Sequence, residues 1–234
     1  MRWYFRELRD RLRHPRSLID WYSMPTQTAE QVPPRVYLID DDPVISFLLV
    51  DLVESIDLPY SVFNGAADFL KQDLSALSGC IVTDVRMPGM SGLDLQDELR
   101  RTEVDLPIIF ISSYPEVPSV VRAMHGGALD FFQKPFSTQR LLDRIQDGLR
   151  IDKARAEIQA RSREMGERMA LLTPREREVL EGVFEGKLTK VIAHELGISQ
   201  RTAETYRHLI MQKLQAGSIA ELVRLTMEFM PGKA

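Results

Sequence analysis

Acidic residues, a hydroxyl group and a lysine stand directly after short apolar runs of the sequence. The first run leads into Asp40 and Asp41, and later runs lead into Asp84, Ser112 and Lys134. Clustered carboxylates raise one another's pKa unless a cation separates them. Mg²⁺ relieves this conflict, because it takes hard oxygen ligands, few carboxylates and a phosphoryl oxygen. A carboxylate beside Mg²⁺ can attack a phosphoryl donor and form an acyl phosphate, while the lysine and the metal neutralise the transferring group.

The elements that would bring these residues together are five β-rich runs, at residues 36–39, 60–63, 80–83, 108–111 and 129–132. Helical stretches of about ten residues separate them. The first helix opens with a proline, which suits a first turn. Its predicted buried stripe, near a 3.6-residue period, consists of Val44, Phe47, Leu48, Leu52 and Ile56. The alternation predicts an α/β fold with a doubly wound, five-stranded parallel sheet, whose ligands bind at the carboxyl ends of the strands.

Each polar feature has a simpler explanation when it is taken alone. An aspartate often ends a strand, and the run Asp40–Asp42 suits a helix N-terminus because of the helix dipole. These explanations do not account for Asp84, Ser112 and Lys134 at the ends of the third, fourth and fifth strands. The joint arrangement therefore favours a phosphoryl-transfer site.

The stretches IDDDP, VTDVRMPGMSG, IIFISS and FFQKPF together resemble the receiver domain of two-component response regulators. The resemblance implies that Asp84 accepts a phosphoryl group and that Lys134 pairs with it. It implies that Asp40 and Asp41 form the acidic pair, with Asp41 a direct Mg²⁺ ligand and Asp40 acting mainly through water. The backbone carbonyl of Arg86 would complete the protein ligands, together with Asp84.

The same resemblance, which covers residues 33–150, also implies a conformational switch. Ser112 would be the switch hydroxyl and Phe131 the switch aromatic, whereas Asp42 is expected only to cap the first helix. The sequence departs from the family at Ser113-Tyr114-Pro115, where a small residue and a flexible turn are more common. The proline stiffens the loop that should move on phosphorylation, which bears on the amplitude of the switch and the lifetime of the phosphate.

A helical linker and a small all-helical domain are expected after the sheet. Residues 151–172 are charged and rich in Ala, Glu and Arg, which favours a helix. Capping boxes at Thr173 and Ser218 and a helix stop at Gly197 predict four helices in residues 173–234. The second and third of these helices form a helix-turn-helix pattern, whose second helix lies in the major groove of DNA.

The third of these helices is expected to bury a spine formed by Ala203, Tyr206, Ile210 and Leu214. Its other face is polar. The segment LTPREREVLEGVFEGKLTKVIAHELGISQRTAETYRHLIMQKL, followed by SIAELVRL, is similar to the LuxR-type helix-turn-helix of FixJ/NarL-class regulators. The similarity implies phosphate contacts by Lys190, Arg201, Thr202 and Arg207, and base-edge contacts by Glu204, Thr205 and His208.

The polar face of this helix also has a plain alternative, a solvated helix surface. The segment departs from the family because Ala203 and Tyr206 stand where Val and His are usual, and because Thr189-Lys190-Val191 replaces the commoner Asn-Lys-acidic run. These replacements alter packing. The net charge of residues 173–234 is only +1, from 9 basic and 8 acidic residues, which is small for a protein that binds the DNA polyanion.

Composition indicates a soluble cytoplasmic protein. The 234 residues are 44% hydrophobic and carry a net charge of −4, and no apolar run approaches the roughly 18 to 20 residues that span a bilayer. The charge is uneven, since residues 33–150 hold 10 basic and 18 acidic residues, a net −8. Cys80 is the single cysteine and is expected to be a buried, inert thiol.

The N-terminal extension, residues 1–32, has no counterpart in the receiver pattern. Tyr4, Phe5, Leu8 and Leu12 share one face of a possible basic amphipathic helix, which could lie on a membrane or dock on a partner. The alternatives are a disordered tail, or a true start at Met24.

These features together predict a regulator of transcription rather than an enzyme. The resemblance implies phosphorylation by a cognate sensor histidine kinase with Mg²⁺, homodimerisation on phosphorylation, binding to double-stranded promoter DNA and contact with RNA polymerase. One alternative is a phosphorylation-independent regulator that uses the receiver as a dimerisation module. Another is a phosphorelay or protein-interaction module whose terminal helices bind protein.

Overall fold

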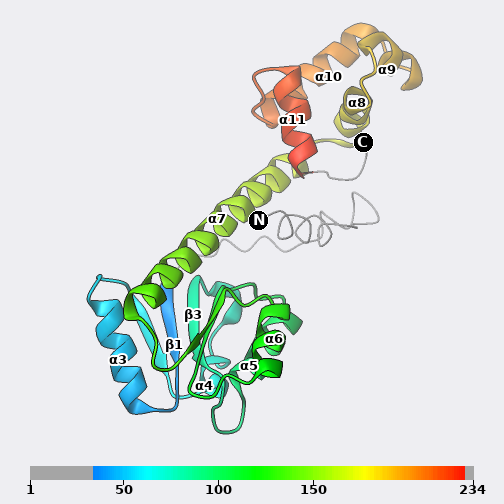
Figure 1. Cartoon of the computed structure of the whole chain (residues 1–234). Helices are drawn as coiled ribbons and strands as arrows, with labels where there is room; N and C mark the ends of the chain where they lie inside the picture. The colour runs from blue at the N-terminus through cyan, green and yellow to red at the C-terminus, as the bar shows by residue number, and fades with distance from the viewer. Residues whose placement is uncertain (1–33, 230–234) are drawn as a thin grey trace. The chain divides into compact units, whose positions relative to one another are not determined.

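The computed structural model describes residues 34–229 (Figure 1). The predicted N-terminal extension, residues 1–32, lies outside the described residues, and so does the possible start at Met24. The described residues form two compact units, and the division falls between residues 157 and 158. Each unit has hydrophobic packing of its own.

The first unit is built on one sheet with the strand order β2-β1-β3-β4-β5. Its strands are β1 (Arg35–Ile39), β2 (Tyr60–Phe63), β3 (Gly79–Asp84), β4 (Ile108–Ser112) and β5 (Asp130–Gln133). Every neighbouring pair is parallel. The predicted five-stranded parallel sheet is confirmed, and the strand bounds differ from the expected ones by at most one residue at either end.

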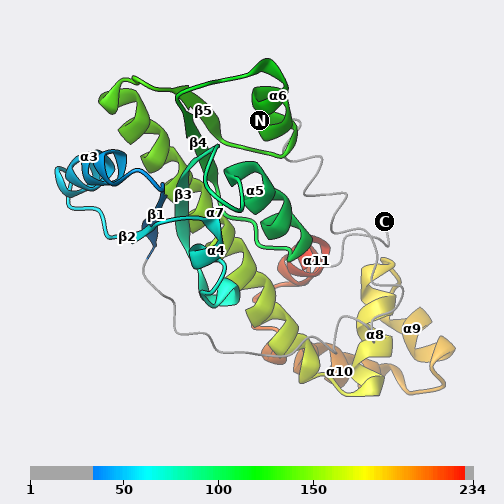
Figure 2. The same cartoon turned by 90° about the horizontal axis from the view of Figure 1, so that it is seen from below.

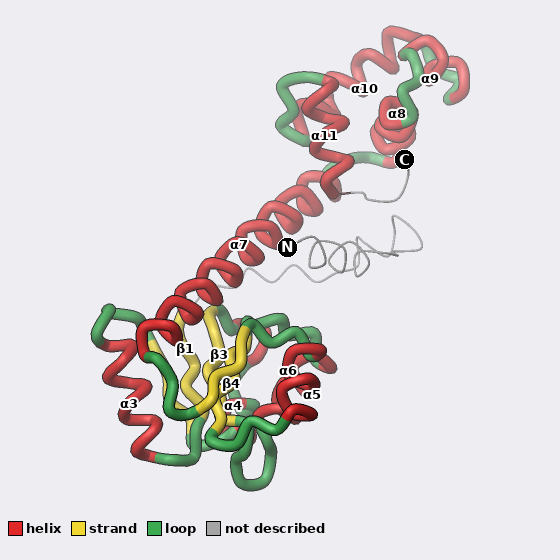
Figure 3. The backbone as a smooth tube through the Cα atoms, in the orientation of Figure 1, coloured by secondary structure: helices red, strands yellow, loops and turns green. Residues whose placement is uncertain are grey.

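Helices alternate with these strands, as Figure 3 shows. They are α3 (Pro43–Glu54), α4 (Ala66–Phe69), α5 (Gly92–Arg101), α6 (Val117–His125) and α7 (Thr138–Ala170), with a short 3₁₀ helix at Leu74–Ala76. Figure 2 shows α3 on one side of the strands and α5 and α6 on the other. The sheet is therefore covered on both faces, as a parallel sheet requires.

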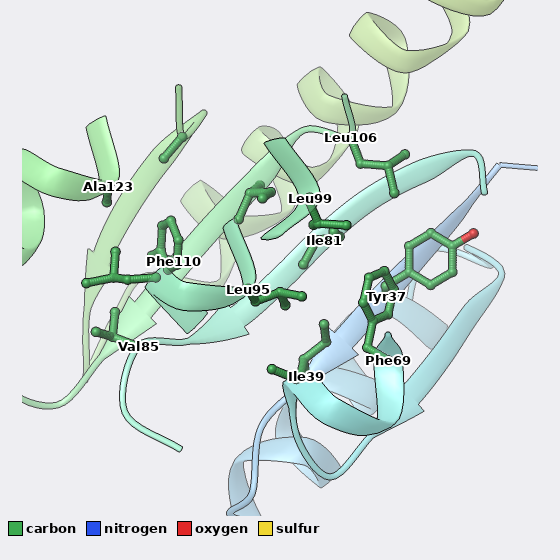
Figure 4. Packing of buried hydrophobic residues seen from close by; sticks show 14 of the residues in the cluster. Tyr37, Ile39, Phe69, Ile81, Val85, Leu95, Leu99, Leu106, Phe110 and Ala123 are labelled. Atoms are coloured by element: carbon green, nitrogen blue, oxygen red, sulfur yellow. The ribbon is translucent and has the colours of Figure 1, made fainter. Parts of the chain in front are cut away.

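Alternate residues of the strands build the two sides of the core, because successive strand side chains point to opposite faces. On one face, Figure 4 shows residues of the strands packed against residues of α4 and α5. The strand residues are Tyr37, Ile39, Ile81 and Phe110, and the helix residues are Phe69, Leu95 and Leu99. The other face packs against α3 and α7 through Val36, Leu38, Val82, Leu49, Leu141 and Ile145. Cys80 is fully buried on this second face, and its burial raises the pKa of its thiol.

The predicted buried stripe of α3 is right for Leu52, which is buried, and for Ile56, which packs partly buried against the core, but wrong for Val44, Phe47 and Leu48, which are exposed. The structure buries Leu49, Leu52 and Val53, whereas Val44 and Phe47 are 71% and 74% exposed. Apolar residues occur all round this helix, so a 3.6-residue period can be drawn along more than one face. The face that packs is the one that meets the apolar side of β1. Which face this is depends on the orientation that the loop after β1 gives to the helix.

The helix after β5 and the linker helix form one continuous helix, α7. The second unit contains the last part of α7 together with α8 (Pro174–Phe184), α9 (Thr189–Glu195), α10 (Gln200–Lys213) and α11 (Ile219–Phe229). Its core includes Met165, Met169, Val179, Ile192, Ile210, Leu214 and Leu222. The predicted all-helical character of this region is confirmed.

Local signals fix the ends of these C-terminal helices. Thr173 caps α8 in a capping box, because its hydroxyl accepts from the Glu176 amide while the Glu176 carboxylate accepts from the Thr173 amide. Ser199 caps α10 by accepting from the Thr202 amide. Between α9 and α10, Gly197 has a φ of 65°, a left-handed conformation that glycine adopts without steric cost. The turn of the helix-turn-helix thus forms as the sequence predicts.

Candidate phosphoacceptor site and nucleic-acid interface

Two carboxylates and a lysine meet at the carboxyl edge of the sheet. The Lys134 ammonium donates to Oδ2 of Asp40 at 2.9 Å and to Oδ1 of Asp84 at 2.7 Å. Asp40 is 1% exposed and Asp84 is 7% exposed. Asp40 and Lys134 directly follow β1 and β5, and Asp84 is the last residue of β3, so the parallel sheet brings the three together from distant parts of the sequence.

Backbone groups hold the two carboxylates in place. The amide of Arg86 donates to Oδ2 of Asp84 at 2.6 Å, and the amide of Asp42 donates to Oδ1 of Asp40 at 2.9 Å. The Asp42 side chain accepts from the amide of Val44 and caps α3, as predicted. Both carboxylates are therefore oriented by the loops that follow their strands.

A glycine lets α5 start close to the site. A Cβ atom on Gly92 would lie 2.2 Å from the backbone oxygen of Asp84, a distance that no side chain tolerates. The amide of Gly92 also donates to the carbonyl of Val85 at 3.0 Å. This close approach fixes the turn that carries Asp84 and Arg86.

The electrostatics of the site follow from burial and from the lysine. Burial raises the pKa of Asp40 above its usual value, although the hydrogen bond from Lys134 opposes the rise. For Lys134, burial lowers the pKa, but the hydrogen bonds to Asp84 and Asp40 outweigh it and the net direction is upward. Lys134 is thus held as a cation beside two acidic groups.

The predicted switch residues lie next to this edge. Ser112, at the end of β4, is 1% exposed, and its hydroxyl oxygen accepts from the amide of Tyr114 at 3.2 Å. Phe131 in β5 is half-buried, with its ring centroid 6.1 Å from that of Phe110. Ser112 lies on β4, next to the strand β3 that ends in Asp84, and Phe131 lies on β5, one strand further along the sheet.

The donor atoms of the site suit Mg²⁺. Asp40 and Asp84 offer buried oxygens, and Asp41 is exposed beside them. Hard carboxylate and carbonyl oxygens are the ligands that Mg²⁺ prefers, and a cation here would offset the cost of burying the Asp40 charge. Among residues 34–229, no ready-made group of three acidic, histidine or cysteine side chains surrounds a metal position, and Lys134 stands between the two buried carboxylates instead.

Sequence reasoning missed three side chains beside the site. The guanidinium of Arg86 forms an ion pair with Glu116 and lies over the ring of Tyr114, 5.8 Å from its centroid. These residues belong to two loops, one after β3 and one after β4. No local pattern could reveal the pairing, since it depends on the neighbourhood of the two strands in the sheet.

The predicted DNA-contacting residues lie on α9 and α10. Most of them are exposed, namely Lys190, Arg201, Glu204, Thr205 and His208, whereas Thr202 and Arg207 are half-buried. On the opposite side, Ala203, Ile210 and Leu214 are fully buried and Tyr206 is half-buried against the core. The predicted division of α10 into a packed and a polar face is therefore present.

Local bonds hold several of these polar side chains. The Arg207 guanidinium donates to the Thr189 hydroxyl and so links α10 to the first turn of α9. The Thr205 hydroxyl donates to the Arg201 carbonyl at 2.9 Å, and the side-chain amide of Gln200 donates to the Glu204 carboxylate at 3.0 Å. Arg207 was predicted only as a phosphate contact, and the structure gives it an additional structural bond.

Comparison with known proteins agrees with both units. Residues 36–146 match the family model of the response regulator receiver domain, and residues 170–226 match the LuxR family of bacterial regulatory proteins. The fold and the sites thus define a response regulator with a DNA-binding domain. Within this class, the chain belongs to the FixJ- and TodT-like transcriptional response regulators. Members of this family are phosphorylation-dependent DNA-binding regulators of two-component systems rather than classical enzymes.

Individual relatives cover most of this chain. Nodulation protein W of Bradyrhizobium diazoefficiens is 37% identical over 88% of this chain and 91% of its own length. TodT of Pseudomonas putida is 41% identical over 82% of this chain and 84% of its own. The solved structure of the response regulator StyR is 38% identical, covers 84% of this chain and 100% of its own, and has a TM-score of 0.78. The family implies a sensor kinase and DNA as partners.

No helix within residues 34–229 is long and apolar enough to cross a membrane.

Proposed function

We propose that Asp84 is the phosphoacceptor of this regulator. The observation that carries the proposal is the placement of Asp84, whose two oxygens accept from the Lys134 ammonium and from the Arg86 amide. These two donors leave the carboxylate oriented at the open carboxyl edge of the sheet. An oxygen of Asp84 attacks phosphorus, the bond from phosphorus to the donor's leaving group breaks, and an aspartyl phosphate forms.

The other residues of the site have supporting roles in this proposal. Lys134 stays charged and pairs with the phosphoryl oxygens, which offsets the charge that Asp84 gains. Asp40, Asp41, Asp84 and the carbonyl of Arg86 would hold Mg²⁺. The metal, when bound, neutralises the phosphoryl oxygens and lowers the barrier to transfer.

The proposed output is a change in the loop after β4. The Ser112 hydroxyl, which accepts from the Tyr114 amide in this structure, would turn to the phosphoryl group, and Phe131 would reorient beside it. The face formed by α6, β5 and the start of α7 then supports homodimerisation. A two-fold dimer presents two copies of α10 to paired half-sites of promoter DNA, where RNA polymerase is the further partner, and we place this action in the cytoplasm.

The phosphoacceptor is tested by labelling with acetyl phosphate and Mg²⁺, read as the mass of the intact protein. The wild type should gain one phosphoryl group and Asp84→Asn none. Asp42→Asn is the matched control, since asparagine also caps a helix, and it should be labelled like the wild type. Persistent labelling of Asp84→Asn would refute the assignment.

The DNA-binding role is tested by selecting duplexes with the full-length protein, with and without phosphorylation, over a range of salt concentrations. Lys190, Arg201, Thr202 and Arg207 should contribute to phosphate contacts, and Glu204, Thr205 and His208 to base contacts. Equal enrichment in both states would favour the phosphorylation-independent regulator. Failure of the 151–234 fragment to bind any duplex would favour a protein-interaction role.

A further inference from the structure

A bridge of three side chains joins the two loops that carry the phosphoacceptor and the switch hydroxyl. Arg86 follows Asp84 by two residues, and its backbone amide donates to the Asp84 carboxylate. Its guanidinium reaches the loop after β4, where it pairs with Glu116 and lies over Tyr114. We call Arg86, Tyr114 and Glu116 the loop bridge.

The far end of the loop bridge is tied to Ser112. The amide of Tyr114 donates to the Ser112 hydroxyl oxygen, and the Tyr114 side chain is 71% exposed. A movement of Ser112 toward a phosphoryl group on Asp84 breaks this hydrogen bond and shifts the loop. The loop bridge resists that shift, because Arg86 is anchored on the other loop.

Glu116 also occupies the N-cap position of α6 without capping it. Its backbone is extended, as an N-cap requires, but its carboxylate caps none of the first-turn amides of α6, all of which lie in the described part of the chain. The first turn of α6 contains no acidic residue, and Pro118 stands within it. A side-chain oxygen at this position can accept from the second or third amide of the helix, and a negative charge there interacts favourably with the helix dipole. Pro118 has no N–H, so the amide that a carboxylate of Glu116 can cap is that of Ser119. Glu116 is instead directed to Arg86.

We propose that Glu116 is a two-position switch residue, which pairs with Arg86 in the unphosphorylated protein and caps α6 in the phosphorylated one. The inference rests on the proposed phosphorylation of Asp84. In the resting state the loop bridge holds the loop after β4 in place. When the loop shifts, Glu116 leaves Arg86 and stabilises the N-terminus of α6, so the cost of breaking the ion pair is offset within the same movement.

Two neutral substitutions of Glu116 separate the two positions. Glu116→Ala and Glu116→Ser both remove the ion pair, but only serine can cap α6. Both should raise the affinity of the unphosphorylated full-length protein for its selected duplex by about two- to fivefold, the factor that an exposed ion pair supplies. Only Glu116→Ser should keep the full affinity of the phosphorylated protein, whereas Glu116→Ala should lose part of it.

The matched control is Glu98→Gln, which removes an exposed ion pair with Arg101 within α5. It should change neither state. Hydrogen exchange provides the second readout. The first-turn amides of α6 should become more protected on phosphorylation of the wild type, should be protected in both states of Glu116→Ser, and should gain no protection in Glu116→Ala. Unphosphorylated Glu116→Ala and Glu116→Ser that bind DNA like the wild type overturn the proposal, as does equal protection of α6 in all variants.

Failure of the proposed phosphorylation can be distinguished from failure of this inference. If the wild type is not labelled on Asp84, the mass of the intact protein shows it directly. The loop bridge is then judged in the unphosphorylated protein alone, where hydrogen exchange across the loop, residues 112–116, must rise in both variants of Glu116 and not in Glu98→Gln.

Discussion

Single residues at the site are held by more than one partner, and this limits what each substitution reports. Lys134 contacts both Asp40 and Asp84, so its removal leaves two buried carboxylates without their cation. Arg207 combines a predicted phosphate contact with a hydrogen bond to Thr189. A useful substitution must distinguish the loss of a bond within the protein from the loss of a contact with the phosphoryl group or the DNA.

Arg207→Ala should weaken DNA binding for every sequence and reduce the slope of log affinity against log salt by about one phosphate contact. The reason is the loss of a positive charge next to the DNA backbone. Binding to several duplexes in a salt titration measures this effect. Thr189→Val is the control, because it removes only the hydrogen bond partner in α9, and its salt slope should equal that of the wild type.

His208→Ala should instead change which base pair is preferred and leave the salt slope unaltered, since His208 is exposed on the polar face of α10 and is proposed to contact a base edge. Selection of duplexes with this variant provides the measurement. A uniform loss of affinity across all sequences would contradict the assignment of His208.

At the scale of elements, the middle of α7 is bound to the sheet by polar contacts in addition to its apolar ones. The buried Asp152 carboxylate accepts from the Ser78 hydroxyl at 2.6 Å and from the Gly79 amide at 2.8 Å. Nearby, Arg155 forms an ion pair with Asp105 at 3.1 Å. These bonds hold α7 against the segments that begin β3 and β4, so the first unit includes helix residues that the sequence assigned to the linker.

Asp152→Ala should lower the free energy of unfolding of the first unit by about 1–3 kcal/mol, because the buried Gly79 amide and the half-buried Ser78 hydroxyl lose their acceptor. Asp152→Asn should cost less, since its amide oxygen can accept the same bonds. Burial raises the pKa of Asp152, so the stability linked to this group is greatest below its unfolded pKa and is lost as pH rises through the folded pKa. Chemical denaturation across this pH window measures both effects, and equal stability of the alanine variant and the wild type would contradict the role of Asp152.

The stability that Glu176 contributes at the start of α8 should show the opposite dependence on pH. Burial acts to raise the pKa of Glu176, but the bonds from Lys213 and Thr173 outweigh it and lower the pKa overall. The stabilisation is therefore present above the unfolded pKa and is lost as pH falls through the folded pKa. Glu176→Gln should destabilise the second unit at neutral pH and flatten its acid response, as measured by calorimetry at several pH values. An unchanged acid response in this variant would contradict the contribution of Glu176.

Element order and strand ends were predictable because they are written in local patterns. The strand runs, the capping residues Thr173 and Ser199, and the turn glycine Gly197 all behaved as their types require. The buried face of α3 was not predictable, because Phe47 and Leu49 are equally apolar and only the direction of packing separates them. The pairing of Arg86 with Glu116 likewise required the sheet itself.

At the scale of the whole molecule, charge opposes the proposed output. Residues 33–150 carry a net charge of −8 and residues 173–234 only +1, and phosphorylation adds about −1.5 to −2 more. Electrostatics alone would then weaken DNA binding on phosphorylation. A gain in affinity must come from another source, and a two-fold dimer supplies one, since it doubles the contacts to the DNA backbone without any new charge on a subunit.

This argument predicts different results on two kinds of duplex. On paired half-sites, phosphorylation should raise the affinity and steepen the dependence on salt, because twice as many phosphates are contacted and each contributes a slope of about −0.9. On an isolated half-site, phosphorylation should give no gain. The measurement is a titration of both duplexes with the wild type and with Asp84→Asn. The affinity of Asp84→Asn should not change on treatment with the phosphoryl donor. An equal gain on the isolated half-site would show that phosphorylation acts within one subunit, by freeing its DNA-binding unit, rather than through a dimer.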